Sequence, residues 1–425
     1  MNQYVYDTYV DILKNELVVA LGCTEPIAIA YAGAKVREVL GQMPQHIRVA
    51  CSGNIIKNVK GVTVPNSGGQ RGIAVAATLG VVGGDAARQL AVLESITPEH
   101  QQTVRELLQG DFCDCDLVEG VANLYILISA VAGQETAEVE IVNYHSNITR
   151  ITKNGKVVFE KGGANDAQHV PLPDKELLNI GDILEFGETV NIEDIREVLE
   201  KQIECNAAIS QEGLAHNWGA NVGSTLLADY DTNDPRVRAK AAAAAGSDAR
   251  MSGCPMPVVI NSGSGNQGIT VTMPVVEYAK AYGKSHEELL RALAVSNLIS
   301  LHQKKYIGSL SAYCGAVSAA TGSAAAICWL MGGSREEIDD TITNTVGTIG
   351  GMVCDGAKAS CAAKIAAAVD TSLMAMQMSQ RGNVFQPGEG LVKGNVEETI
   401  KSIGRMGREG MRSTDVEILN IMLDK

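Results

Sequence analysis

Hydrophobic and polar residues follow a helical period at the start of the chain. Within residues 3–20 the apolar positions of one helix face are Val5, Tyr9, Leu13, Leu17 and Val18. This period predicts an amphipathic helix that stops at Gly22. A second helix is predicted to begin at Thr24, a good N-cap residue, with Pro26 in its first turn. It should end at Gly41, because glycine is favoured just past a helix end.

Residues 46–190 have a different pattern, with many short segments that are typical of β-strands. Strands are predicted within "IRVACSG", "GVTVPN", "NLYILISAVA" and "AEVEIVNYH". In "NITRITKNGKVVFEK" the apolar positions alternate on either side of Asn154-Gly155, which predicts a type I′ hairpin. Helices are expected at about 71–80 and 97–109. This span therefore predicts a smaller, mixed α/β domain.

The pattern from residue 191 to residue 425 is helical. One long helix is predicted over 192–214, and others over 234–251, 285–300, 301–330 and 357–378. Ser285 and Glu288 have the spacing of a capping box. Alanine, glycine and serine dominate these helices and allow close packing, so we expect a compact bundle that includes residues 1–45. The fold class is α+β, with an Ala/Gly-rich helical domain and the smaller mixed domain.

Composition and charge narrow the partners. The 425 residues carry a formal net charge of −14, and the basic residues are scattered. A nucleic-acid-binding protein usually shows a basic stripe, so DNA and RNA are not expected as partners. The first 22 residues do not resemble a signal peptide, and no run of 18 apolar residues indicates a membrane span. We therefore expect a cytoplasmic protein without a membrane partner, in which the small-residue helices pack within one chain or across a homodimer.

Ten cysteines in a reducing compartment are unlikely to form a disulfide framework. Those with suggestive small or glycine neighbours are Cys23, Cys254, Cys314, Cys354 and Cys361. The other five are expected to pack as small hydrophobic residues.

Cys354 and Cys361 lie seven positions apart in "GGMVCDGAKASCAAK". Seven residues of one continuous helix span ~10.5 Å, which is too far for two ligands of one small metal site. If both are ligands, Cys354 must precede a helix that starts at Ala357, with Asp355 or Gly356 as N-cap. The positive end of that helix would then stabilise a thiolate at Cys354.

Cys314, in "LSAYCGAVSAATG", is the natural third ligand because its surroundings have the same small-residue texture. Three thiolates could bind zinc with an open position, with His302 nearby in sequence. They could equally bind three irons of a [4Fe–4S] cluster and leave the fourth iron open as a Lewis acid. His216 and His302 are acid–base candidates, although each is more simply a core histidine. Lys304, Lys305 and Lys358 come without a signature of pyridoxal phosphate.

Two Gly/Asn/Ser-rich loops are candidates for holding a substrate carboxylate. Their candidate residues are Asn261, Ser262, Ser264 and Asn266 in "NSGSGNQG" and Asn66, Ser67 and Arg71 in "PNSGGQRG". Free backbone N–H groups in such loops favour anions, and an arginine can bind a carboxylate with two hydrogen bonds. The same composition also serves ordinary turns. The loops resemble each other and are each followed by an apolar run.

Four motifs, "ALGCTEPIAIA", "NSGSGNQGI", "LSAYCGAVSAATG" and "GGMVCDGAKASCAAK", together resemble the L-cysteine desulfidase family, which is related to the α-chain of iron–sulfur L-serine dehydratases. The resemblance spans nearly the whole chain. It implies a [4Fe–4S] cluster, no pyridoxal phosphate, and β-elimination of L-cysteine to pyruvate, ammonia and sulfide. It places the cluster ligands at Cys314, Cys354 and Cys361, which makes residues 191–425 the catalytic domain.

Cys23 stands where the serine dehydratases have a histidine-containing stretch, which favours cysteine as the small-molecule substrate. Its role is open between base, sulfur relay, cluster ligand and structural thiol, and Thr24 and Glu25 beside it are candidate substrate contacts. A thiol at a helix N-terminus can have a lowered pKa, as a base requires. The alternative functions are an L-serine dehydratase and a non-enzymatic iron–sulfur or zinc protein.

Overall fold

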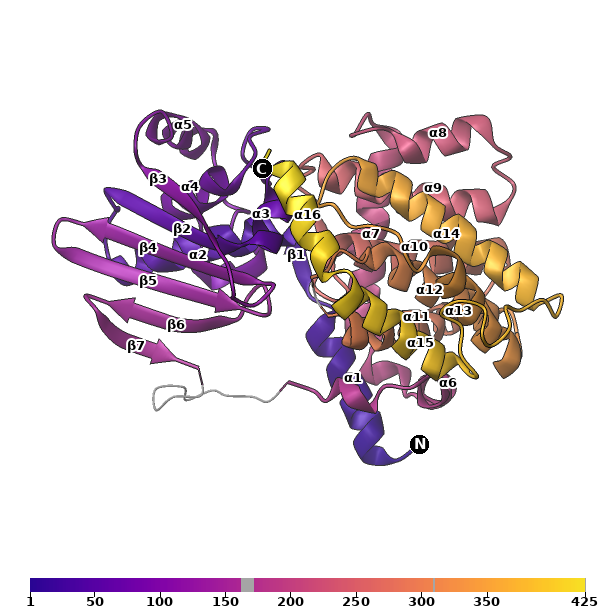
Figure 1. The fold of residues 1–425 in the computed structure, drawn as a ribbon. Helices are drawn as coiled ribbons and strands as arrows, with labels where there is room; N and C mark the ends of the chain where they lie inside the picture. Colours follow the sequence, from indigo (N-terminus) through magenta and orange to yellow (C-terminus); the bar gives the residue numbers. More distant parts are fainter. Residues whose placement is uncertain (162–171, 309, 425) are drawn as a thin grey trace.

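The computed structural model describes residues 1–161, 172–308 and 310–424 and has two parts (Figure 1). A sheet with a few helices forms one part, and a helical assembly forms the other. The predicted α+β class is confirmed. Within the described residues, no helix has both the length and the apolar character needed to cross a membrane.

Strands β2 to β7 form one six-stranded sheet with the order β3-β2-β4-β5-β6-β7. Their bounds are β2 His46–Ser52, β3 Cys113–Val118, β4 Tyr125–Ala132, β5 Glu135–Val142, β6 Ile148–Lys153 and β7 Lys156–Glu160. β2 is parallel to β3, and the other neighbours are antiparallel. The β6–β7 turn confirms the predicted hairpin, because Asn154 and Gly155 both have positive φ (52° and 73°).

The helices of the sheet part cover its buried side. Their bounds are α2 Thr24–Leu40, α3 Gly53–Val59, α4 Ile73–Gly83, η1 Ala86–Ala91 and α5 Pro98–Leu107. α2 packs on β4, β5 and α4, whereas α1 (Gln3–Glu16) contacts α11 of the helical part. Within residues 1–45, which were predicted to pack with the C-terminal helices, α1 thus contacts the helical part and α2 contacts the sheet part. Nearly every side chain of α2 is buried, so its sequence does not reveal which neighbour it covers.

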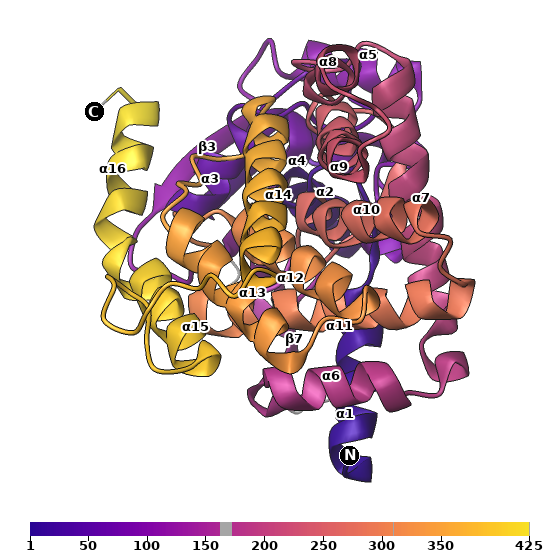
Figure 2. The same ribbon diagram turned by 90° about the vertical axis from the view of Figure 1, so that its right-hand side faces the viewer.

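The helical part follows β7 and is closed by the C-terminal segment. Its α-helices are α6 Ile180–Thr189, α7 Arg196–Ala215, α8 Val222–Asp229, α9 Pro235–Met251, α10 Gly265–Ala281, α11 His286–Ile307, α12 Gly315–Leu330, α13 Arg335–Ile349, α14 Ser360–Ser379, α15 Val396–Arg405 and α16 Arg412–Met422. Shorter turns are η2 Lys175–Leu177, η3 Ile192–Asp194 and η4 Met406–Gly410. Figure 2 shows α9, α10, α12 and α14 gathered near the centre, where α10 and α14 each contact α9 and α12.

Small residues are what allow these helices to approach closely. A Cβ atom on Gly213 of α7 would lie 2.0 Å from the Ala245 carbonyl oxygen of α9. The capping box of α11 is confirmed: Ser285 and Glu288 each accept a hydrogen bond from the other's backbone N–H. The α16 helix returns to the sheet part and packs on α3 (Figure 1).

Several local predictions differ from the structure. The first helix, predicted to stop at Gly22, already ends at Glu16 and is followed by the strand of residues 19–21. Residues 61–66 form no strand, only an isolated bridge between Thr63 and Arg71. The helix expected over 301–330 is interrupted after Ile307. The first of the two helices ends there because Gly308 has a φ of 99°, a conformation that strains L-residues. The next helix begins at Gly315. The helix expected from Ala357 begins at Ser360, since Gly356 also has a positive φ (93°).

The sequence pattern gave no sign of a two-stranded antiparallel sheet formed by β1 (Val19–Leu21) and β8 (Pro257–Val259). Three residues are too few to show a period. This small sheet matters for the site, because each strand is followed by a loop and a helix, α2 after β1 and α10 after β8.

Candidate active site

Four helix N-termini meet at one cavity of about 100 Å³. They belong to α2, α10, α12 and α14, and residues of the first two turns of each helix or its N-cap line the cavity. Unpaired N–H groups at helix N-termini carry partial positive charge and favour anions such as thiolates and carboxylates. The cavity is therefore an electropositive place within a negatively charged protein.

The three cysteines predicted as cluster ligands line this cavity together. Cys314 is the N-cap residue of α12, and its N–H donates to the Met352 carbonyl oxygen at 2.9 Å. The Cys354 N–H donates to the Ala312 carbonyl oxygen at 2.6 Å, so the two cysteine loops are hydrogen-bonded side by side. Cys361 is the second residue of α14. Cys354 thus precedes the helix, as the spacing required.

The thiols of this group are costly to ionise in the metal-free protein. Burial, followed by the charge of Cys354, raises the pKa of Cys314 to about 12. Burial also raises the pKa of Cys361. Metal binding requires thiolates and so must release these protons, which makes loading of the site pH-dependent.

The donor set suits an iron–sulfur cluster. All three cysteines are free, and they reach the same cavity from α12, the 352–356 loop and α14. Among the described residues, no group of three or more His, Cys, Asp or Glu side chains is arranged to hold one metal ion. Cluster cysteines each bind a separate iron, so three cysteines that line one cavity are a donor set that a cluster could use.

Cys23 lies on another wall of the same cavity, in a dense polar network. It is the N-cap residue of α2, is 1% exposed, and its thiol donates to Glu25 Oε2 at 3.2 Å. Asn58 Nδ2 donates to Glu25 Oε1 at 3.1 Å, and His145 Nε2 lies 3.8 Å from the same oxygen. Thr24 Oγ1 lies 3.1 Å from Glu25 Oε2 and 2.9 Å from the Gly263 carbonyl oxygen. Glu25 therefore joins Cys23 to the loop before α10.

The charges in this network correct the expectation for Cys23. Burial, and then the charge of Glu25, raises the pKa of the Cys23 thiol well above its ordinary value, although Arg250 acts in the opposite sense. Burial would also raise the pKa of Glu25. The contacts with His145 and Cys23 and the charge of Arg250 instead lower it to about 2. At neutral pH the resting pair is a thiol that donates to a carboxylate, and the helix N-terminus does not produce a thiolate.

Thr24 itself is the first residue of α2 and not its N-cap, which is Cys23. Thr24 is 1% exposed and lies behind the cavity wall, where it supports Glu25. Cys23 also packs in a small apolar cluster with Val62 and Met251 that borders on Cys361. This position places Cys23 next to the predicted ligand group.

The second Gly/Asn/Ser loop contributes most of its predicted residues. Ser262, Ser264 and Asn266 line the cavity, and Ser264 caps α10. Asn261 does not. Its amide donates to Asn297 Oδ1 at 2.9 Å and accepts from Ser300 Oγ at 3.0 Å, so it fixes the loop to α11.

The first loop lies outside this cavity. The Asn66 amide donates to the Leu93 carbonyl oxygen at 2.9 Å, and the Ser67 hydroxyl donates to the Gln70 carbonyl oxygen at 2.9 Å. Arg71 is exposed, and its backbone forms the bridge to Thr63. These three predicted contacts are not brought to the cavity, because the loop packs behind Gly22, where a Cβ atom would lie 2.2 Å from Pro65 Cγ.

Other candidates also find structural roles. His302 is fully buried and its Nε2 lies 2.7 Å from Glu397 Oε2, away from the cavity. His216 is exposed and pairs with Glu212. Lys358 pairs with Asp355, and Cys254 is buried outside the cavity lining.

The cavity residues that the sequence analysis did not single out as site residues include Asn58, His145 and Arg250, as well as Lys304, which it named only as lacking a signature of pyridoxal phosphate. Each stands alone in its segment, so no local spacing could have singled it out. Lys304 is 5% exposed, and burial lowers its pKa to about 8 against the opposing charges of Cys354 and Cys314. A buried cation beside the ligand cysteines would balance part of the negative charge of a thiolate-bound cluster.

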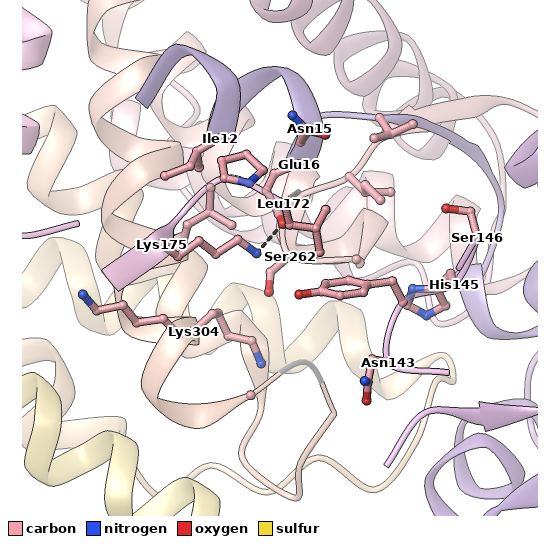
Figure 3. Close-up of a pocket in the computed structure, with 18 of the residues that line it drawn as sticks. Ile12, Asn15, Glu16, Asn143, His145, Ser146, Leu172, Lys175, Ser262 and Lys304 are labelled. Carbon is pink, nitrogen blue, oxygen red and sulfur yellow. Dashed lines mark hydrogen bonds and ion pairs between the residues drawn. The ribbon is translucent and has the colours of Figure 1, made fainter. Parts of the chain in front are cut away.

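A larger cavity of about 760 Å³ adjoins the first one (Figure 3). The two share His145, Ser262, Gly263 and Lys304 in their linings. Residues of α1 and of the loop around Tyr144 form other walls, and Lys175 there is paired with Glu16. The larger cavity and the small one therefore lie against a common wall formed by these four shared residues.

Comparison with known proteins agrees with the class that the fold and the cysteine group indicate. A family model described as serine dehydratase alpha chain matches residues 87–420. The chain therefore belongs to the serine dehydratase alpha chain family. This membership supports an enzyme of the lyase class with an iron–sulfur cofactor.

Several close relatives share the whole length of the chain. A UPF0597 protein of Lachnoclostridium phytofermentans is 49% identical over 420 residues, which cover 99% of this chain and 100% of the relative. UPF0597 proteins of Desulfitobacterium hafniense and Finegoldia magna are 48% and 47% identical. These matches cover 99% and 98% of this chain and 97% and 99% of the relatives.

Proposed function

We propose that the protein is a pyridoxal-phosphate-independent iron–sulfur lyase that eliminates sulfide from L-cysteine to give pyruvate, ammonia and sulfide. One observation carries the proposal. Cys314, Cys354 and Cys361 line the same 100 Å³ cavity as the Cys23–Glu25 pair. A cluster donor set and an acid–base pair thus face a space of amino-acid size.

A cluster bound by the three cysteines would supply an open iron that, as a Lewis acid, binds the substrate thiolate and improves sulfide as a leaving group. The protein supplies the remaining chemistry. The electropositive helix ends favour the substrate carboxylate, and the small volume excludes most water.

Removal of the α-proton is assigned to Cys23 with Glu25. Because the resting thiol is protonated, Cys23 acts as a base only after its proton has left through Glu25 Oε2, 3.2 Å away, towards His145. Glu25 relays this proton and does not keep it, because its pKa is about 2. His145 lies next to Glu25 and also lines the larger cavity, so it offers the proton a way out.

The test is anaerobic reconstitution with ferrous iron and sulfide, followed by pyruvate assays with L-cysteine and L-serine side by side. We expect a [4Fe–4S] absorption spectrum and faster turnover of L-cysteine. The Cys354→Ala variant should lose both, while Cys115→Ala, which alters an exposed thiol on β3, should keep both.

L-Serine dehydration is the second candidate, because the family model carries that description. A higher kcat/KM for L-serine would favour it. A loaded cluster without pyruvate from either amino acid would refute the lyase function. Cys23→Ala separates the roles of that thiol, since a full cluster with lost turnover indicates catalysis and a lost cluster indicates ligation.

A further inference from the structure

Arg250 is a buried cation that the reaction scheme above does not use. It lies in the last turn of α9, is 2% exposed and lines the small cavity. Its Nε donates to the Gly22 carbonyl oxygen at 2.9 Å. Among the described residues its two terminal nitrogens form no hydrogen bond or ion pair. The charge of Arg250 acts on Glu25 and Cys23, but no direct polar contact from the described residues occupies the outer edge of the guanidinium, which leaves that edge available to an anionic ligand.

Close packing fixes the guanidinium in place. A Cβ atom on Gly265 would lie 2.3 Å from Arg250 Nε, so only glycine fits there. The bond to Gly22 ties the other side to the loop that carries Cys23. Arg250 is thus rigidly held between the N-termini of α2 and α10, and a planar fork held in this way suits a carboxylate.

Two unpartnered acceptors line the same cavity. Asn266 Oδ1 and Gln267 Oε1, in the first turn of α10, are buried and have no hydrogen-bond partner among the described residues. Gln267 lies against the start of α12, since a Cβ atom on Gly315 would be 2.5 Å from its Cδ. Buried acceptors of this kind need a donor, which a ligand ammonium group can provide.

We propose that Arg250 binds the α-carboxylate of a free α-amino acid and that the amides of Asn266 and Gln267 accept from its ammonium group. This inference rests on the proposed function for its substrate but makes a narrower claim. The site recognises the amino-acid zwitterion itself. Amino-acid esters, N-acylated amino acids and peptides are excluded, the last two also by the small volume.

The test uses the metal-free protein and L-alanine, which has no β leaving group, in isothermal titration calorimetry. L-Alanine should bind, whereas its methyl ester and N-acetyl-L-alanine should not. Arg250→Gln and Arg250→Lys should each weaken binding by more than about tenfold, because neither restores the charged fork. The control is Arg71→Gln, an exposed arginine outside the cavity, which should bind L-alanine like the wild type. Circular dichroism checks that each variant is folded.

Failure of recognition and failure of the lyase function give different results. Absence of L-alanine binding by the wild type, or equal binding by folded Arg250→Gln, would overturn the role of Arg250. If the Arg250→Gln variant formed pyruvate from L-cysteine with the wild-type kcat/KM, the role of Arg250 would also be overturned, although the lyase function would stand. If L-alanine binding depended on Arg250 but no pyruvate formed from L-cysteine, the role of Arg250 would stand and the lyase function would be refuted.

Discussion

Two loops with nearly the same sequence have different roles in this protein. "VPNSGGQRGI" and "VINSGSGNQGI" each join a short apolar segment to a helix, α4 and α10 respectively. The first loop uses its polar side chains to close its own turn and to hold Leu93. The second leaves Ser262, Ser264 and Asn266 facing the small cavity. Loop composition alone therefore does not distinguish a turn from a binding site.

The difference arises from what precedes each loop. Before the second loop, β8 pairs with β1, which brings α10 beside the Cys23 loop. Thr24 Oγ1 then lies 2.9 Å from the Gly263 carbonyl oxygen, and Glu25 connects this junction to Cys23. The first loop follows no paired strand. A long-range pairing, and not the loop itself, decides which of the two becomes part of the site.

The largest effect is expected when the Glu25 carboxylate, which connects Cys23 to the loop before α10, is removed. Glu25→Gln should lower kcat for L-cysteine by about 10²–10⁴-fold, the usual contribution of a positioned acid–base group. The amide cannot take the Cys23 proton. The measurement is steady-state pyruvate formation by reconstituted enzyme with matched cluster content. A kcat within a factor of a few of the wild type would contradict the assignment.

The same carboxylate predicts a pH dependence of stability. The pKa of Glu25 is lowered to about 2 from an ordinary 4.5, so the group stabilises the fold above pH 4.5 and loses this contribution as the pH falls towards 2. A shift of that size corresponds to ~3 kcal/mol. We expect the free energy of unfolding of Glu25→Gln, measured by urea titration, to fall less steeply over this range than that of the wild type. Parallel curves would show that Glu25 is not perturbed.

The two asparagines of the loops should separate function from stability. Asn266→Ala should lower kcat/KM for L-cysteine about tenfold with little change in stability, because Asn266 Oδ1 has no partner among the described residues. Asn66→Ala should leave kcat/KM unchanged but cost ~1 kcal/mol, since it removes the 2.9 Å bond to Leu93. Its φ of 55° also suits asparagine better than alanine. Activity assays and urea unfolding of both variants give the comparison, and the opposite assignment of effects would contradict it.

Much of this site was accessible from local sequence. The small and glycine neighbours of the cysteines, the spacing of Cys354 and Cys361, and the similar composition around Cys314 predicted a shared site, and the structure brings all three to one cavity. The β6–β7 hairpin and the α11 cap were equally local. In each case the residues that determine the structure lie within a few positions of one another.

The rest depends on distant partners. Arg250, His145 and Lys304 come from three separate segments, and only the tertiary fold brings them together. Asn261 and Asn266 belong to the same loop, yet the former is bound by Asn297 and Ser300 of α11 and the latter is left free for the cavity. The raised pKa of Cys23 likewise depends on burial and on Glu25, which outweigh the helix N-terminus.

The smallest effect is expected at Arg71, which tests the first loop most directly. Arg71→Ala removes an exposed guanidinium that lines neither cavity, while the backbone bridge to Thr63 is retained. Stability should therefore change by less than ~0.5 kcal/mol, as for most surface substitutions. The KM for L-cysteine should stay within about twofold of the wild type, because RT ln 2 is a negligible part of a binding energy. If KM rose tenfold while kcat was unchanged, Arg71 would be binding substrate. The two loops would then share one role, and the pairing of β1 with β8 would not be what separates them.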